Sequence, residues 1–140
     1  PKPVVEVFGI YTIKNDLIAR LDMSHGITDE AANVAVIEGQ LGTYNAQDLD
    51  AHVAFFADDV VVADFNGAEN LHGVAAYRAR YANVFAQYPG NHAELIGRLA
   101  CGPIVVDHER VSRAARGEPF DVLAIYTLRD GKIARVDFVR

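Results

Sequence analysis

The sequence has little of several features that mark whole classes of proteins. A single cysteine, Cys101, excludes an intramolecular disulfide and a paired-thiol zinc site, and it suits a reducing cytoplasm. The formal net charge is -6, so the chain lacks the basic surface that nucleic acids require. The longest apolar runs reach about six residues, whereas a membrane helix needs about 20. We therefore expect a cytoplasmic protein that binds neither nucleic acid nor a membrane.

Motifs for several kinds of chemistry are also missing. The chain has no glycine-rich phosphate loop, no nucleophile elbow and no cysteine and histidine pair in the context of a catalytic thiol. His92, His108 and Asp64 could in principle hold a metal ion, but no short ligand motif such as HxH or HExxH is present. We expect neither a metal nor another cofactor.

The apolar residues that are present predict one α+β domain. With 140 residues and 51% hydrophobic content, the chain can close a single core. Helical spacing predicts a helix capped by Thr28, a short helix capped by Asp48, and a third helix that starts after Gly73 and ends before Pro89. Alternating β-branched residues predict strands at 60–65, 92–100, 104–112, 120–128 and 133–139. Helices should cover one face of a curved antiparallel sheet.

Residues 1–22 form a separate unit because they repeat the end of the chain. The segment from Gly9 to Met23 is identical to the segment from Ala124 to Phe138 at seven of fifteen positions. We predict an extra β-hairpin that duplicates the C-terminal hairpin, followed by the main domain at 23–140. Chance similarity of two amphipathic hairpins is the alternative. The hairpin should add to a sheet edge or dock against a second subunit, and we expect a homodimer.

Asp64 is the first candidate for chemistry. The two-residue period of a strand places it on the same face as Val60 and Val62, which should point inward. A carboxylate among valines would have a raised pKa, as a general base working near neutral pH requires. The alternative is that Asp64 sits at a strand end and caps the turn at Asn66 and Gly67.

Further candidates lie on the later strands. Tyr126 shares a face with Val122 and Ala124, so its hydroxyl could reach a cavity, and simple packing in the core is the alternative. His92 and Glu94 alternate on one strand and His108 lies on the next, so the three could form a polar cluster in a pocket. A solvated outer sheet face explains them equally well.

Four stretches, in this order and at this spacing, resemble a known superfamily. They are YNAQDLD at 44–50, FADDV at 56–60, LHG at 71–73 and YTLRDGKI at 126–133. Residues 28–140 are similar to the ketosteroid isomerase-like and SnoaL-like polyketide cyclase superfamily, which has the nuclear transport factor two-like, or cystatin-like, fold. The resemblance implies a cone-shaped curved antiparallel sheet wrapped around three N-terminal helices and enclosing an apolar pocket.

The resemblance also implies roles for particular residues. Asp64 matches the aspartate that shuttles the proton in ketosteroid isomerases. Gln40 and Ala124 stand where those enzymes have their two oxyanion donors, so 3-oxosteroid isomerisation is not expected. If the protein is an enzyme, we expect His92, His108 or Tyr126 to orient or polarise the substrate, and Glu94 is the next candidate for the base after Asp64. The residues expected to line the pocket are Tyr44, Phe56, Val62, Tyr81, Val122, Ala124 and Phe138.

Three functions remain open from sequence. The first is an enzyme of isomerase, cyclase or epoxide hydrolase type, with Asp64 as base or acid on a small hydrophobic substrate. The second is a binding module for a hydrophobic ligand without catalysis, and the third is an interaction protein with a filled core. A carboxylate that lines a cavity opposite a polar partner would favour the enzyme.

Overall fold

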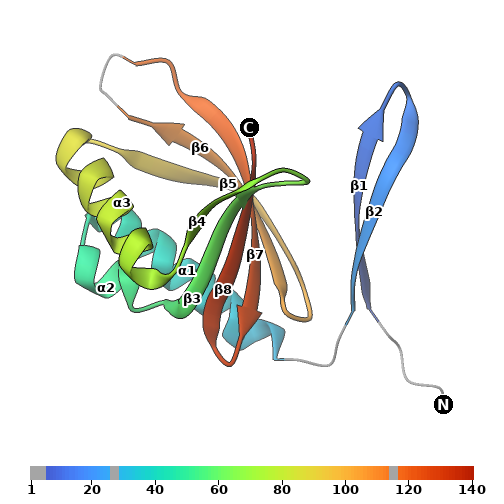
Figure 1. Ribbon diagram of the computed structural model, residues 1–140, viewed down its shortest axis with the longest axis horizontal. Helices are drawn as coiled ribbons and strands as arrows, with labels where there is room; N and C mark the ends of the chain where they lie inside the picture. The colour runs from blue at the N-terminus through green and yellow to red at the C-terminus, as the bar shows by residue number, and fades with distance from the viewer. Residues whose placement is uncertain (1–5, 26–28, 114–116) are drawn as a thin grey trace.

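The computed structural model of the chain describes residues 6–25, 29–113 and 117–140. In chain order the elements are β1 (Val7–Lys14), β2 (Leu17–His25), α1 (Glu30–Ala46), α2 (Leu49–Val53), β3 (Phe56–Asp64), β4 (Glu69–His72), α3 (Val74–Gln87), β5 (His92–Cys101), β6 (Ile104–Ser112), β7 (Phe120–Arg129) and β8 (Lys132–Val139). Figure 1 shows the helices on one side of a six-stranded sheet and the β1–β2 hairpin on its other side. The α+β class predicted from sequence is confirmed.

Aspartate side chains cap the first two helices, α1 and α2. The Asp29 side chain accepts a hydrogen bond from the Ala32 backbone N–H at 3.1 Å and caps α1. Thr28, the predicted cap, lies outside the described residues. Asp48 caps α2 as predicted, by accepting from the Ala51 N–H at 3.1 Å. No helix in the described segments is both long and apolar enough to cross a membrane.

Two predictions about the fold are wrong, one about the strand directions in the sheet and one about the place of the helices in the chain. The strand order of the sheet is β4-β3-β8-β7-β6-β5, and β3 pairs with β8 in parallel. The sheet is therefore not purely antiparallel. Strand β8, the last strand of the β5–β8 meander, lies beside β3 and runs in the same direction. The helices are not all N-terminal either, since α3 follows β3 and β4. Strand β4 has only four residues and no clear alternation, so the sequence did not predict it.

The core lies between the helices and the concave face of the sheet. Its buried residues are Ile37, Phe56, Val60, Val62, Leu71, Tyr77, Val105, Ala124, Tyr126, Leu128, Ile133 and Val136. In β7 the core residues Ala124, Tyr126 and Leu128 sit at alternate positions, as the two-residue period predicts, whereas Ile133 and Val136 of β8 are three residues apart, across a register shift. This packing fixes the direction in which every other side chain of β6 and β7 points.

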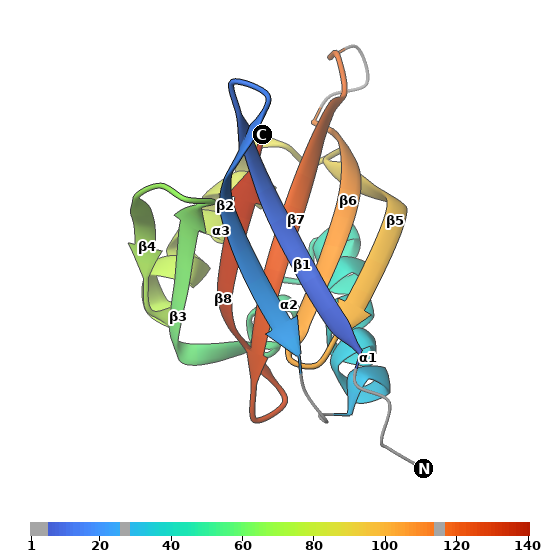
Figure 2. The ribbon, with the colours of Figure 1, turned by 90° about the vertical axis from the view of Figure 1, so that its right-hand side faces the viewer.

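The hairpin forms a two-stranded sheet of its own and does not extend the edge of the main sheet. Figure 2 shows it lying across the outer face of that sheet. The Asn66 side-chain amide donates to the Thr12 hydroxyl at 2.7 Å, and the Cys101 thiol donates to the Glu6 carbonyl at 3.5 Å. The hairpin therefore contacts its own domain at both ends of β1.

The hairpin matches the β7–β8 hairpin in geometry as well as in sequence. Both turns place two consecutive residues at positive φ, which is the tight turn that suits the twist of the flanking strands. In both hairpins the register shifts directly after the equivalent threonine, Thr12 and Thr127. Each second strand carries a two-bond ion pair. The pairs are Arg20–Asp22 (2.8 and 2.9 Å) and Arg135–Asp137 (2.8 Å for both). The common origin of the two hairpins stays a prediction.

Candidate functional site

A cavity of about 120 Å³ lies between the helices and the concave face of the sheet. Its inner end is formed by buried residues such as Gln40, His52 and Glu109. Its outer end carries the more exposed Arg80, Arg113 and Arg140. The aromatic lining residues are Tyr44, Tyr77, Tyr81, Phe120, Tyr126 and Phe138. The cavity is thus amphipathic, and the purely apolar pocket that the resemblance implies is not what the structure has.

Glu109 is the one carboxylate that lines this cavity among the described residues. It shares the inward face of β6 with Val105 and Val111, and only 7% of its surface is exposed. Its Oε1 atom has no hydrogen-bond partner within the described part of the chain. A buried carboxylate oxygen without a partner is costly, so such a group holds its proton more tightly than in water.

The pKa of the Glu109 carboxyl is accordingly raised to about 7, chiefly by burial and then by the negative charge of Asp107. Arg98 and the Tyr126 hydroxyl act in the opposite direction. Asp107 is fully buried and accepts two hydrogen bonds from Arg98, at 2.7 and 2.8 Å, so its charge is held in place. A carboxyl with a pKa near 7 can both accept and return a proton at neutral pH.

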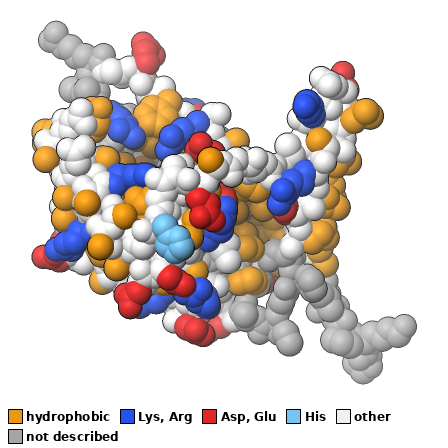
Figure 3. Space-filling view, viewed as in Figure 1, with side chains coloured by type: hydrophobic (Ala, Val, Ile, Leu, Met, Phe, Trp, Pro, Cys, Tyr) orange, Lys and Arg blue, Asp and Glu red, His pale blue; other side chains and the backbone are white. Residues whose placement is uncertain are grey.

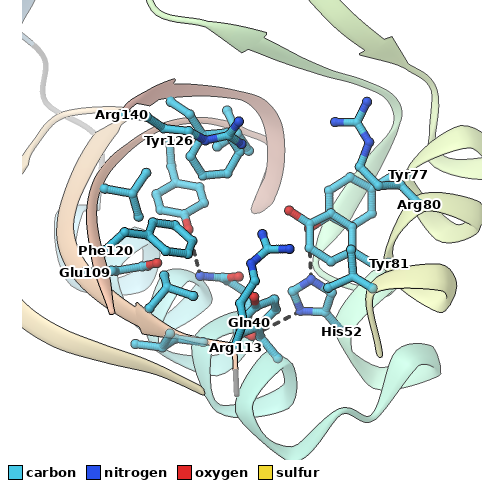
Figure 4. Close-up of a pocket in the computed structure, with 17 residues that line it drawn as sticks. Gln40, His52, Tyr77, Arg80, Tyr81, Glu109, Arg113, Phe120, Tyr126 and Arg140 are labelled. Atoms are coloured by element: carbon cyan, nitrogen blue, oxygen red, sulfur yellow. Dashed lines mark hydrogen bonds between the residues drawn. The ribbon is translucent and has the colours of Figure 1, made fainter. Parts of the chain in front are cut away.

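Tyr126 and Gln40 face the cavity beside Glu109, as Figure 4 shows. The Gln40 amide Nε2 donates to the Tyr126 hydroxyl oxygen at 3.1 Å. Burial, followed by the charge of Glu109, raises the pKa of Tyr126 well above its ordinary value. The hydroxyl therefore keeps its proton, and that proton is available to the carboxylate or to an oxygen of a bound molecule.

His52 is a neutral structural residue on the opposite wall. Only 1% of its surface is exposed, and burial lowers its pKa to about 4. Its Nδ1 lies 3.1 Å from the Gln40 carbonyl, which can only accept, so Nδ1 carries the proton. Nε2 then accepts from the Tyr77 hydroxyl at 2.8 Å. This fixes the positions of Gln40 and Tyr77 around the cavity.

The prediction that Asp64 faces an apolar pocket is wrong. The period of β3 does put Asp64 on the side of Val60 and Val62, but the strand ends there and the Asp64 side chain is exposed. Its backbone closes the following turn, with the Gly67 N–H donating to the Asp64 carbonyl at 2.8 Å. The alternative interpretation, a residue at a strand end beside the turn, matches the structure.

The other predicted residues divide into three groups. Tyr44, Tyr81, Val122, Tyr126 and Phe138 line the cavity. Phe56, Val62 and Ala124 are buried in the core and are not among the lining residues. His92 and Glu94 are exposed, and His108 lies on the outer face, where its Nε2 is 2.9 Å from an Asp121 carboxylate oxygen. The expected polar cluster of His92, Glu94 and His108 inside the pocket is therefore wrong, because these positions alternate away from the core.

Sequence reasoning missed Glu109, although a signal was present. The stretch from Val105 to Val111 alternates valine, aspartate, glutamate and valine at every second position, while His108 and Arg110 fall between them. The valines define the inward face, so the two acidic residues had to share it. Across the described residues, no three histidine, cysteine, aspartate or glutamate side chains are grouped so that they could hold a metal ion.

Comparison with known proteins agrees with this architecture. The SnoaL-like domain family matches residues 37–136. An uncharacterized cystatin-fold protein from Novosphingobium aromaticivorans is 35% identical, with a TM-score of 0.72 over 82% of this chain and 100% of that chain. A protein provisionally assigned as a polyketide cyclase, from Sinorhizobium meliloti, is 26% identical, with a TM-score of 0.66 over 75% of this chain and 94% of that chain. A SnoaL-like protein of unknown function from Burkholderia thailandensis is 22% identical, with a TM-score of 0.67 over 81% of this chain and 98% of that chain. With its helices, its mixed sheet and the cavity between them, the chain belongs to the SnoaL-like domain family.

Proposed function

We propose that the protein is an enzyme that transfers a proton at a carbon beside a carbonyl group of a small substrate. The observation that carries this proposal is Glu109: a buried carboxyl that faces a cavity, has a pKa of about 7 and stands next to the Tyr126 hydroxyl. Groups with a pKa near the working pH are the most efficient general acids and bases. In this proposal Glu109 takes the role that the resemblance gave to Asp64.

The proposed reaction needs only these groups. The ionised Glu109 carboxylate removes a proton from the carbon, and the electron pair of the broken C–H bond moves into an enolate. The Tyr126 hydroxyl, oriented by Gln40, donates to the enolate oxygen. The Glu109 carboxylic acid then returns the proton to carbon, at the same or another position.

The size of the cavity limits the substrate. A cavity of about 150 Å³ takes up one benzene ring, so the 120 Å³ found here admits about one ring. A four-ring 3-oxosteroid would extend beyond this space through the open end of the cavity. The size therefore supports the expectation, drawn from Gln40 and Ala124, that steroid isomerisation is not the reaction.

The test is exchange of hydrogen for deuterium in D₂O, followed by NMR, with propiophenone as a neutral one-ring ketone probe. We expect the wild-type protein to accelerate exchange at the carbon beside the carbonyl, Glu109→Gln to lose at least about 100-fold of that rate, and Tyr126→Phe to lose less. Glu118→Gln, at an exposed position outside the cavity, is the control. Exchange lost in Asp64→Asn and kept in Glu109→Gln would return the base to the end of β3.

A binding module without catalysis is the second candidate, and the cavity itself favours it. The same cavity could hold a hydrophobic ligand without any proton transfer. Saturable binding of propiophenone by calorimetry, with no acceleration of exchange at any pH between 5 and 9, would support this function over the enzyme.

A further inference from the structure

The arginines at the outer end of the cavity differ from the other arginines of the described chain. Every other described arginine forms a salt bridge with an aspartate or glutamate, and these are Arg20, Arg78, Arg98, Arg110, Arg129 and Arg135. Within the described residues, Arg80, Arg113 and Arg140 have no carboxylate within salt-bridge distance, and all three line the cavity. Three arginines without a carboxylate partner among the described residues therefore line one cavity of a protein whose net charge is -6.

Arg113 is held at the centre of this group. Its guanidinium lies 4.9 Å from the centre of the Tyr88 ring and 5.5 Å from that of Phe120, so two aromatic faces hold the cation without consuming its hydrogen-bond donors. Figure 4 shows it between the wall that carries Glu109 and Tyr126 and the wall that carries Tyr81. A guanidinium with free donors matches the oxygens of a carboxylate or a phosphate.

The neighbouring arginines are positioned as well. Arg80 donates to the Asn70 side-chain oxygen at 3.0 Å and to the Asn70 carbonyl at 2.7 Å, which fixes its side chain beside the cavity. Arg140 lies over the Phe138 ring at 5.3 Å. When Glu109 is ionised, the charged lining groups still sum to a positive value, which favours an anionic ligand.

From these observations we propose that the substrate is an organic acid with about one ring, whose oxyanion is bound by Arg113 with Arg80 and Arg140 near it. The ring enters the cavity, and the carbonyl stands beside Tyr126 and Glu109. This inference rests on the proposed function for the place of the carbonyl, but the binding of the anion itself does not depend on catalysis.

The test compares two probes of nearly the same size, the charged 4-oxo-4-phenylbutanoate and its neutral amide, by calorimetry at pH 8. We expect the wild-type protein to bind the acid at least about tenfold more tightly than the amide, and the preference to shrink as salt is added. Arg113→Gln should remove most of this preference, because the nearest cation is lost. Arg129→Gln, which breaks an ion pair with Asp59 away from the cavity, should keep it.

Equal binding of the acid and the amide by the wild-type protein, or a preference that survives Arg113→Gln, would overturn the inference. 2-Phenylethyl phosphate forms the second arm: tighter binding of this probe than of the carboxylate would assign the site to phosphate monoesters within the same oxyanion class. Glu109→Gln separates the two proposals, since it should abolish exchange and keep the preference for the acid. A preference for the acid with no exchange in any probe would leave the anion site standing and end the catalytic proposal.

Discussion

At the scale of single residues, two buried titratable groups pull the pH dependence of stability in opposite directions. The pKa of Glu109 is about 7 in the folded protein against an ordinary 4.5, so the stability linked to its proton is present below about pH 4.5 and is lost as the pH rises through 7. The pKa of His52 is about 4 against an ordinary 6.5. Its contribution is present above about pH 6.5 and is lost as the pH falls through 4.

These opposite signs give a prediction for Glu109→Gln. Between pH 4.5 and 6.5 the two groups offset each other in the wild-type protein, and the variant should show the His52 dependence alone, with a free energy of unfolding that rises with pH. At pH 8 the variant should exceed the wild type by up to about 3 kcal/mol, since no buried charge forms. Urea unfolding at fixed pH measures both effects. Parallel pH profiles for variant and wild type would mean that Glu109 titrates normally.

The presence of the buried Glu109 carboxyl, although it lowers stability, is informative about function. A buried carboxyl with an unpartnered oxygen lowers stability, and natural proteins keep such groups mainly where chemistry needs them. Asp64, in contrast, is exposed to solvent at the end of β3, so its carboxylate does not lower the stability of the fold through burial. The sequence alone could not distinguish the buried Glu109 from the exposed Asp64. The two-residue period shows on which face of a strand a residue lies, but it does not show how much of that face the helices cover.

At the scale of elements, β5 and β6 are joined by a buried ion pair that can be compared with an exposed one. Asp107 is fully buried and paired with Arg98, whereas the Asp121 carboxylate is half exposed and paired with Arg110 and His108 on the outer face. Removing one partner of a buried ion pair lowers the free energy of unfolding strongly, because the other charge then stays buried without a partner. Exposed pairs contribute little, because water screens them.

We therefore expect Asp107→Asn to lower the free energy of unfolding by about 3 kcal/mol, and Asp121→Asn to change it by less than about 1 kcal/mol. Both substitutions keep side-chain size, so the difference reports burial of the charge. Urea unfolding at pH 7 gives both values. Similar losses in the two variants would show that Arg98 is solvated well enough to stand alone.

The element boundaries also show what could be predicted. The four strands of the meander were predicted within one residue of their observed ends, because alternation and turn residues are local signals. The parallel pairing of β3 with β8 was not predicted, since it depends on how distant segments meet. The cavity was predicted through its aromatic residues. Its charged residues were missed because Glu109 lies among valines, Arg80 lies inside α3, and Arg113 and Arg140 follow the ends of β6 and β8.

At the scale of the whole molecule, the hairpin leaves a large apolar surface uncovered. The face that carries Ile10 and Asp22 turns toward the main sheet, where these residues line an open space together with Ile125, Arg135 and Asp137. The opposite face is apolar and exposed, with Val7, Tyr11, Ile13, Ile18 and Leu21 each 47–61% accessible. Figure 3 shows these orange side chains along the side of the hairpin that faces away from the domain.

The matching face of the β7–β8 hairpin is covered by the helices, so its duplicate should also find a cover. The equivalents of Tyr11, Ile13 and Leu21 are the buried Tyr126, Leu128 and Val136. An apolar face of this extent is unusual on a protein that stays monomeric. The prediction of a homodimer therefore takes a specific form: two copies meet through this face about a twofold axis, since a face with these uncharged side chains can pair with itself.

The hairpin makes this prediction testable without disturbing the domain. We expect the wild-type chain to form a dimer in light scattering, and the double substitution Tyr11→Ser with Leu21→Ser to shift it to monomer, because both side chains lie at the centre of the free face and pair with each other across the strands. Removing residues 1–22 should have the same effect. Arg20→Gln, on the opposite face of the hairpin, is the matched control and should stay dimeric. Thermal unfolding must show an intact domain in each variant, since the exposed hairpin contributes little to the core. A dimer that survives both changes would place the contact elsewhere, and a monomeric wild type would mean that the apolar face stays in water.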